Sequence, residues 1–170
     1  MATRQLLAGI AKHEAQHCFH GAVMQMEPNI WPIVKLFPRF TLEEADGMWC
    51  AAFVYYCCKK AGFIIPTRPN ECTASLAGCL QWEEWAMGDN RVEYFKASDD
   101  FAPEAGDIVL FDNVFIGREH DHIGIVIEDK GTAIVVAEGN INNVSGVVER
   151  KKDTYVRGYI RIPDNYEYGM

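Results

Sequence analysis

The first half of the chain begins with a helical apolar pattern and continues into a proline-rich segment. Residues 4–20 carry Leu6, Leu7 and Ile10 at helical spacing, which predicts an opening helix. Three prolines fall within residues 28–40. Because proline lacks an amide donor and fixes φ, we expect an extended or turned connector there.

Two further helices are predicted before the pattern changes. Residues 49–61 are mostly apolar and small, and Gly62 is a suitable residue to end that helix. Residues 71–87 form the next predicted helix, with Asn70 as its N-cap and Gly88 at its end.

The second half of the chain has the pattern of an antiparallel sheet. After Asp99, short runs rich in β-branched residues alternate with turn signals, at 107–111, 122–127, 132–138, 146–151 and 156–162. Helices followed by strands indicate an α+β fold with about five or six strands. The length of 170 residues suits one domain. We therefore expect 1–170 to form a single domain, with residues 1–40 packed on a core at 45–163.

One predicted hairpin brings polar side chains together. Residues 122–128 and 132–138 are joined by a three-residue loop that ends at a glycine, a common hairpin connection. If Glu128 pairs with Thr132, then His122 lies opposite Glu138, and Asn140 lies two residues further on the same face. The pattern therefore predicts an imidazole beside a carboxylate and an amide.

A cysteine is placed where a nucleophile would be expected. Of the six cysteines, Cys50 lies in the first turn of the 49–61 helix. Unpaired amides and the helix dipole stabilise a thiolate there. A histidine base held by a third polar group is what such a nucleophile requires. Cys50, His122 and either Glu138 or Asn140 are therefore the predicted catalytic set, and the alternative is that Cys50 is a small buried residue with no catalytic role.

Charge and hydropathy exclude several partners. The net charge is −8, with no basic cluster, so we expect no nucleic-acid binding. No apolar run approaches the length of a membrane-spanning helix. The apolar stretch before Lys12 is too short for a secretory signal, which favours a cytoplasmic protein or export by another route.

These motifs occur in an order that resembles a known family. WCAAFV at Cys50, PEAGDIVLF, DHIGIV at His122, AEGN at Glu138 and Asn140, and VRGYIRI resemble the CHAP family of cysteine, histidine-dependent amidohydrolases and peptidases. The resemblance implies a papain-like fold and cleavage of amide bonds in bacterial peptidoglycan, with no metal or cofactor. It also implies the peptide stem as partner, a monomer, and release to the cell wall by phage lysis or specialised secretion.

Other interpretations remain open at this stage. The same thiol chemistry would serve a toxin, a transpeptidase or a protein-directed peptidase, and a non-catalytic binding module would keep the same fold. Trp49, Phe111 and Asp112 are predicted to contact substrate. His13–His17 matches the HExxH pattern of zinc peptidases, but a zincin needs a sheet ahead of that helix, so a polar helix face is the favoured interpretation.

Overall fold

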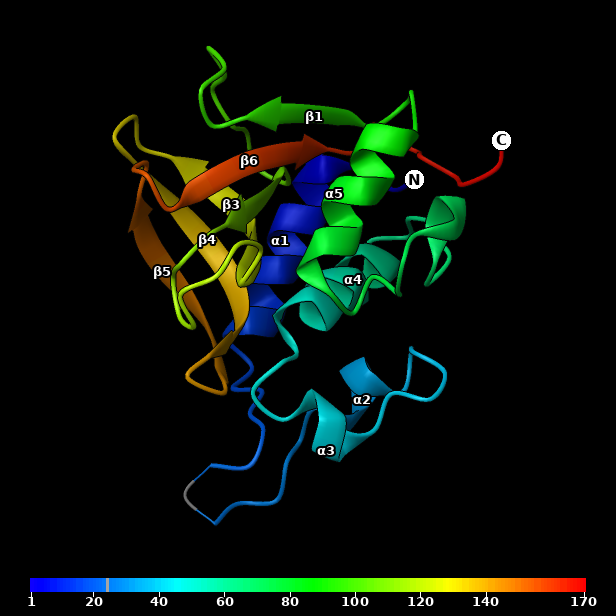
Figure 1. Cartoon of the computed structure of the whole chain (residues 1–170), viewed down its shortest axis with the longest axis vertical. Coiled ribbons are helices and arrows are strands. Elements are labelled where there is room, and N and C mark those ends of the chain that lie inside the picture. Colours follow the sequence, from blue (N-terminus) through cyan, green and yellow to red (C-terminus); the bar gives the residue numbers. More distant parts are fainter. Residues whose placement is uncertain (24) are drawn as a thin grey trace.

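The computed structural model describes residues 1–23 and 25–170 and contains helices followed by a sheet (Figure 1). The helices are α1 (Arg4–Ala15), α2 (Trp31–Val34), α3 (Leu42–Ala45), α4 (Cys50–Lys60), the 3₁₀ turn η1 (Pro69–Glu71) and α5 (Cys79–Gly88). The strands are β1 (Glu93–Lys96), β2 (Ile108–Phe111), β3 (His122–Asp129), β4 (Ala133–Ile141), β5 (Val144–Lys151) and β6 (Val156–Arg161).

The strands form one antiparallel sheet in the order β1-β6-β2-β3-β4-β5. Helices α1 and α4 pack against strands β3 and β4, and α5 lies beside β1 (Figure 1). This arrangement confirms the predicted α+β class, with the Cys50 helix resting on the sheet.

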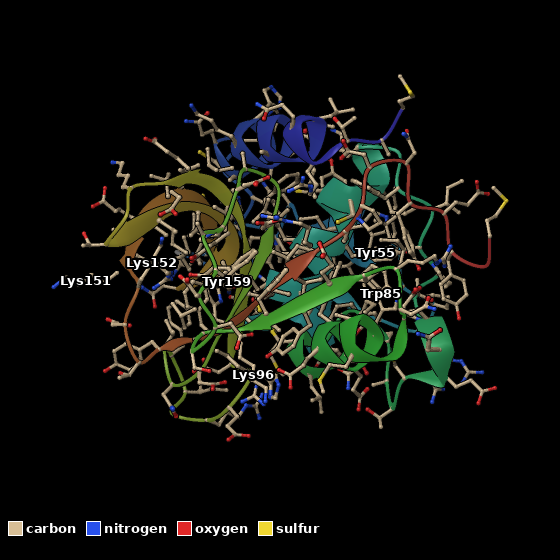
Figure 2. All side chains as sticks on the ribbon, turned by 90° about the horizontal axis from the view of Figure 1, so that it is seen from above. Tyr55, Trp85, Lys96, Lys151, Lys152 and Tyr159 are labelled. Atoms are coloured by element: carbon tan, nitrogen blue, oxygen red, sulfur yellow. The ribbon has the colours of Figure 1, made fainter. Side chains whose placement is uncertain are left out.

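Residues 1–40 contribute to the same core as the rest of the chain. Leu7, Ile33 and Phe37 belong to one hydrophobic cluster that extends to Tyr166. Viewed from above, Tyr55 and Trp85 lie among the helices, at a distance from the surface lysines (Figure 2). A second, smaller cluster covers the other face of the sheet. Within the described part of the chain, no helix is long and apolar enough to cross a membrane.

Two predicted helices are shorter than expected. The first ends at Ala15 because Cys18 takes a positive φ of 56° and the chain turns to bridge His20 to Val144 on β5. The helix expected from residue 71 begins only at Cys79, after an extended Gly78. Asn70 is not its N-cap, and instead takes a left-handed φ of 48° inside η1.

The sequence pattern also missed one strand. β1 lies before Asp99, where no strand was expected, and is held by pairing with β6. Its exposed and half-exposed residues lack the apolar run that marks the other strands.

The predicted hairpin register was wrong by two residues. Ile125 pairs with Ala137 instead of Val135, and a bulge at Ile127 shifts the pairing again toward the turn. The alternation of side chains has a period of two, so on the His122 side of the bulge the shift of two residues keeps the side chains on their predicted face. His122 and Glu138 therefore still share a face, although they are not direct cross-strand partners.

Candidate active site

Cys50 is the first residue of α4. The preceding Trp49 makes no side-chain cap hydrogen bond to the opening amides of the helix. The residue is 6% exposed and lines a cleft instead of lying on open surface. Gly139 of β4 lets α4 approach closely, because a Cβ there would lie 2.6 Å from Cβ of Phe53 and 2.8 Å from the Trp49 ring.

His122 lies at the start of β3 and contacts Glu138 of β4. Nε2 of His122 is 2.7 Å from Oε2 of Glu138, and both side chains are fully buried. Within the described residues, the other ring nitrogen, Nδ1, is buried with no hydrogen-bond partner of regular geometry. Because Nε2 is held by the carboxylate, Nδ1 is the nitrogen available to the neighbouring Cys50.

Glu138 also binds Arg150, a residue that the sequence analysis did not identify. Nη2 of Arg150 donates to Oε2 of Glu138 at 2.6 Å, and Nε donates to Oε1. The guanidinium lies 5.1 Å from the ring centroid of Phe111. The buried Glu138 side chain fits because Gly124 has no side chain: a Cβ there would lie 2.9 Å from Cγ of Glu138.

The electrostatics favour a thiolate and an imidazolium. Contact with the thiol of Cys79 and then with His122 lowers the pKa of Cys50 to about 5, against the effect of burial. Burial alone would lower the pKa of His122, but Cys50 and Glu138 raise it to about 9. Burial would raise the pKa of Glu138, yet hydrogen bonds from Arg150 and His122 lower it. Between these values both Cys50 and His122 are charged, as thiol catalysis requires.

The other buried thiols of α4 have the opposite character. Burial raises the pKa of Cys57 and of Cys58 well above that of a free cysteine. A neutral thiol is a poor nucleophile. Cys50 is therefore the cysteine of this helix that is suited to attack a carbonyl.

Two asparagines of the β4–β5 region hold the segment before Cys50. Nδ2 of Asn140 donates to the Gly47 carbonyl at 2.8 Å, so its amide faces that loop and not the imidazole. Oδ1 of Asn143 accepts from the Gly47 amide at 3.0 Å and from Nε1 of Trp49 at 2.9 Å. The sequence pattern predicted Asn140 only as a partner of His122 and carries no signal for the role of Asn143.

The Cys50 thiol opens into a cleft of about 290 Å³. It is lined by Gly47, Met48, Cys50, Ala77, Gly78, Cys79, Phe115, Ile116, Arg118, His120, Asp121 and Asn140. Asp121 accepts hydrogen bonds from the amides of Val114, Phe115 and Ile116, which fixes this loop. The Phe115 ring packs edge-on at 4.7 Å from the His122 ring and helps to exclude water from it.

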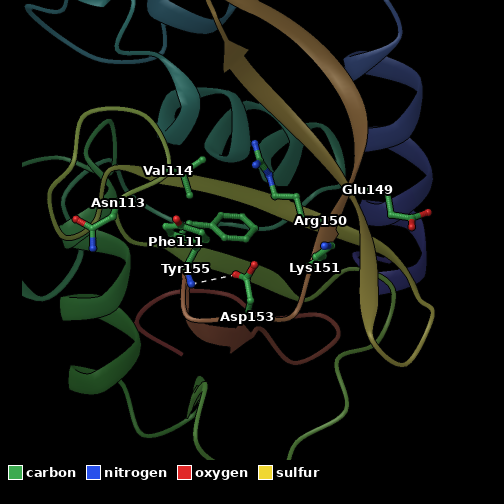
Figure 3. A pocket seen from close by; sticks show the side chains of 8 residues that line it. All are labelled: Phe111, Asn113, Val114, Glu149, Arg150, Lys151, Asp153 and Tyr155. Atoms are coloured by element: carbon green, nitrogen blue, oxygen red, sulfur yellow. Dashed lines mark hydrogen bonds between the residues drawn. The ribbon is translucent and has the colours of Figure 1, made fainter.

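None of the three residues predicted to contact substrate lines the Cys50 cleft. Trp49 is fully buried in the core, where it supports the start of α4. Phe111 is 1% exposed and lies beneath a separate hollow beside Arg150 and Tyr155 (Figure 3). The Asp112 carboxylate binds the His120 amide at 2.7 Å and Arg157 at 3.2 Å, outside the Cys50 cleft. All three were chosen for residue type, which does not show which way a side chain points.

The HExxH segment has a different role from the one its pattern indicates. Glu14 is buried and accepts from Nζ of Lys60 at 2.6 Å and from the Tyr56 hydroxyl at 3.1 Å. Glu14 therefore joins α1 to α4. It does not belong to the polar helix face that was predicted for this segment. Across residues 1–23 and 25–170, no three His, Cys, Asp or Glu side chains converge to hold a metal ion.

Comparison with known proteins points to one family. Residues 43–140, more than half of the chain, match the family model of the CHAP domain. That domain is typically a cysteine- and histidine-dependent amidohydrolase. The matched range contains Cys50, His122, Glu138 and Asn140 but ends before Arg150. No curated protein matches the chain.

Proposed function

The chain belongs to the CHAP family, and from this premise we propose that it hydrolyses an amide bond of bacterial peptidoglycan by thiol catalysis. In this proposal Cys50 is the nucleophile, His122 the general acid and base, and Glu138 the residue that orients the imidazole. The observation that carries the proposal is the buried His122, bound to Glu138 at 2.7 Å and adjacent to a thiol whose pKa is lowered to about 5.

The first half of the reaction would form a thioester. The Cys50 thiolate attacks the carbonyl carbon, and the carbonyl oxygen becomes an oxyanion. The backbone amide of Cys50, at the uncapped start of α4, is a suitable donor to it. As the C–N bond breaks, the His122 imidazolium gives its proton to the leaving amine.

The second half would release the product. Neutral His122 takes a proton from water, and the resulting hydroxide attacks the thioester carbonyl. The C–S bond breaks, the acid product leaves, and the thiolate and imidazolium are restored. Glu138 stays ionised throughout, because Arg150 and His122 both donate to it.

The choice of substrate rests on the family and on the cleft. Gly47 and Gly78 line the cleft beside Cys50 and add no side chain that would hinder a peptide chain. Arg118 lies in its wall, in a protein of net charge −8. A cation at that position suits a peptide stem that carries carboxylates.

Purified cell walls provide the direct test. We expect the protein to reduce the turbidity of a wall suspension and Cys50→Ala to leave it unchanged. Mass spectrometry of the released muropeptides then identifies whether the cut lies at the sugar–peptide amide or within the peptide. Cleavage of an unstructured protein with no action on walls would point instead to a protein-directed peptidase. A Cys50 that does not react with iodoacetamide would indicate a binding module.

A further inference from the structure

A second thiol lies against the proposed nucleophile. Sγ of Cys50 and Sγ of Cys79 are 3.6 Å apart, and both residues line the same cleft. We propose that Cys79 is a resolving cysteine, which captures oxidised Cys50 as a reversible disulfide. This inference rests on the proposed function only in taking Cys50 as the nucleophile.

The geometry requires little movement. A disulfide needs the two sulfur atoms about 2.05 Å apart, and here they are already in van der Waals contact. Cys50 is the first residue of α4 and Cys79 is the first residue of α5, so the bond would join the starts of two helices. Cys72, the nearest cysteine in sequence to Cys79, has its thiol directed at the Gln81 carbonyl at 3.7 Å instead.

The oxidant in this proposal is hydrogen peroxide. The Cys50 thiolate attacks one peroxide oxygen, the O–O bond breaks, and hydroxide leaves to give a sulfenic acid at Cys50. The Cys79 thiol then loses its proton and attacks the Cys50 sulfur, and the sulfenic oxygen leaves as water. In total two thiols and one peroxide give one disulfide and two waters, a balanced two-electron oxidation.

The two thiols are suited to act in this order. Cys50 has the lowered pKa and so supplies the thiolate that reacts with peroxide. Contact with Cys50, followed by burial, raises the pKa of Cys79. Once Cys50 is a neutral sulfenic acid, the contact no longer places a negative charge beside Cys79. The start of α5, where Gly78 provides no side-chain cap, then favours the Cys79 thiolate, against the burial and the Asp121 charge that still raise its pKa.

The consequence is a nucleophile that can be switched off without being lost. The disulfide removes the thiolate from the cleft, which stops hydrolysis. It also prevents further oxidation of Cys50 to the sulfinic acid, which ordinary thiols do not reverse. A dithiol reductant would restore both thiols, and hydrolysis with them.

The test compares the intact chain with Cys79→Ser, with Cys18→Ser as the matched control at an exposed cysteine. Each protein is treated with hydrogen peroxide and then with dithiothreitol. We expect peroxide to lower the mass of the intact chain by two hydrogen atoms, and peptide mapping to find Cys50 joined to Cys79. Iodoacetamide labelling of Cys50 should be lost and then recovered after reduction. The Cys18→Ser variant should behave identically, whereas recovery in Cys79→Ser should be about tenfold lower because Cys50 is over-oxidised.

The mass readout separates this inference from the proposed function. A Cys50–Cys79 cross-link in a protein that does not digest walls would refute the substrate and leave the disulfide standing. The inference would be overturned if peroxide gave no such cross-link in the intact chain, or if Cys79→Ser recovered its labelling as fully as the intact chain. If Cys79→Ser does not fold, the peptide map of the intact chain alone decides the question.

Discussion

Substituting Glu138 by glutamine tests most directly whether the carboxylate orients and stabilises the His122 imidazolium. The carboxylate accepts from His122 at 2.7 Å and from Arg150 at 2.6 Å. Glutamine has nearly the same shape but only one acceptor oxygen, and its NH₂ group must face a donor. The imidazolium would therefore lose its anionic partner, while the packing around the side chain stays the same.

The expected loss follows from the hydrogen bond between His122 and Glu138. A hydrogen bond to a charged group contributes about 1.5–3 kcal/mol, and a tenfold change in rate corresponds to about 1.4 kcal/mol. We therefore expect kcat/KM to fall by about 10- to 100-fold. Glu138 also helps to hold the pKa of His122 at about 9. Removing an anion destabilises the cationic imidazolium, so this pKa falls and the alkaline limb of the activity profile moves to lower pH.

The assay is the pH dependence of kcat/KM together with the rate of iodoacetamide labelling at Cys50. Glu149→Gln is the matched control, because that carboxylate lies on the neighbouring strand β5 in a surface pair with Lys130. We expect this control to keep the profile of the unmodified protein. A folded Glu138→Gln variant with an unmoved alkaline limb and full activity would refute the role of the carboxylate.

Three further outcomes are expected. Cys50→Ala should fold, as shown by circular dichroism, but lack activity, whereas Cys58→Ala should stay active; loss in both would move the nucleophile. Activity of the unmodified protein should rise with pH through about 5, as Cys50 loses its proton, and fall through about 9, as the imidazolium of His122 loses its own. Glu14→Ala should lower the melting temperature, because losing the hydrogen bond from Lys60 reduces the free energy of unfolding by about 1 kcal/mol. Turnover and resistance to chelators should stay unchanged. Chelator inactivation reversed by zinc would instead support the HExxH site.

The sequence predicted the structure well where the alternation of side chains along a strand determines which residues share a face. The period of two placed His122 and Glu138 on one face even though the register was wrong, because an error of two residues preserves that face. The bulge at Ile127 that shifts the pairing depends on how the twisted strands meet. No local pattern in 122–138 signals it.

Contacts between distant segments could not be predicted in the same way. Arg150 reaches Glu138 from the next strand, and Cys79 reaches Cys50 from a helix whose predicted start was several residues too early. Each contact depends on how two elements pack in three dimensions. Trp49 and Phe111 are buried instead of lining the Cys50 cleft, for the related reason that an aromatic residue near a motif is as well suited to the core.

The absence of a side chain at Gly139 has a consequence for how this site could be altered. The nucleophile Cys50 lies on helix α4 and its base His122 lies on the sheet. At Gly139 the backbone of β4 packs directly against the side chains of Phe53 and Trp49. A methyl group at residue 139 would push α4 away from β4, because its carbon would lie less than 3.0 Å from atoms of Phe53 and Trp49. Gly139→Ala would thus separate the thiol from the imidazole while every catalytic group remained chemically intact. The reactivity of Cys50 and His122 therefore depends on how closely α4 packs against β4, as well as on the residues that do the chemistry.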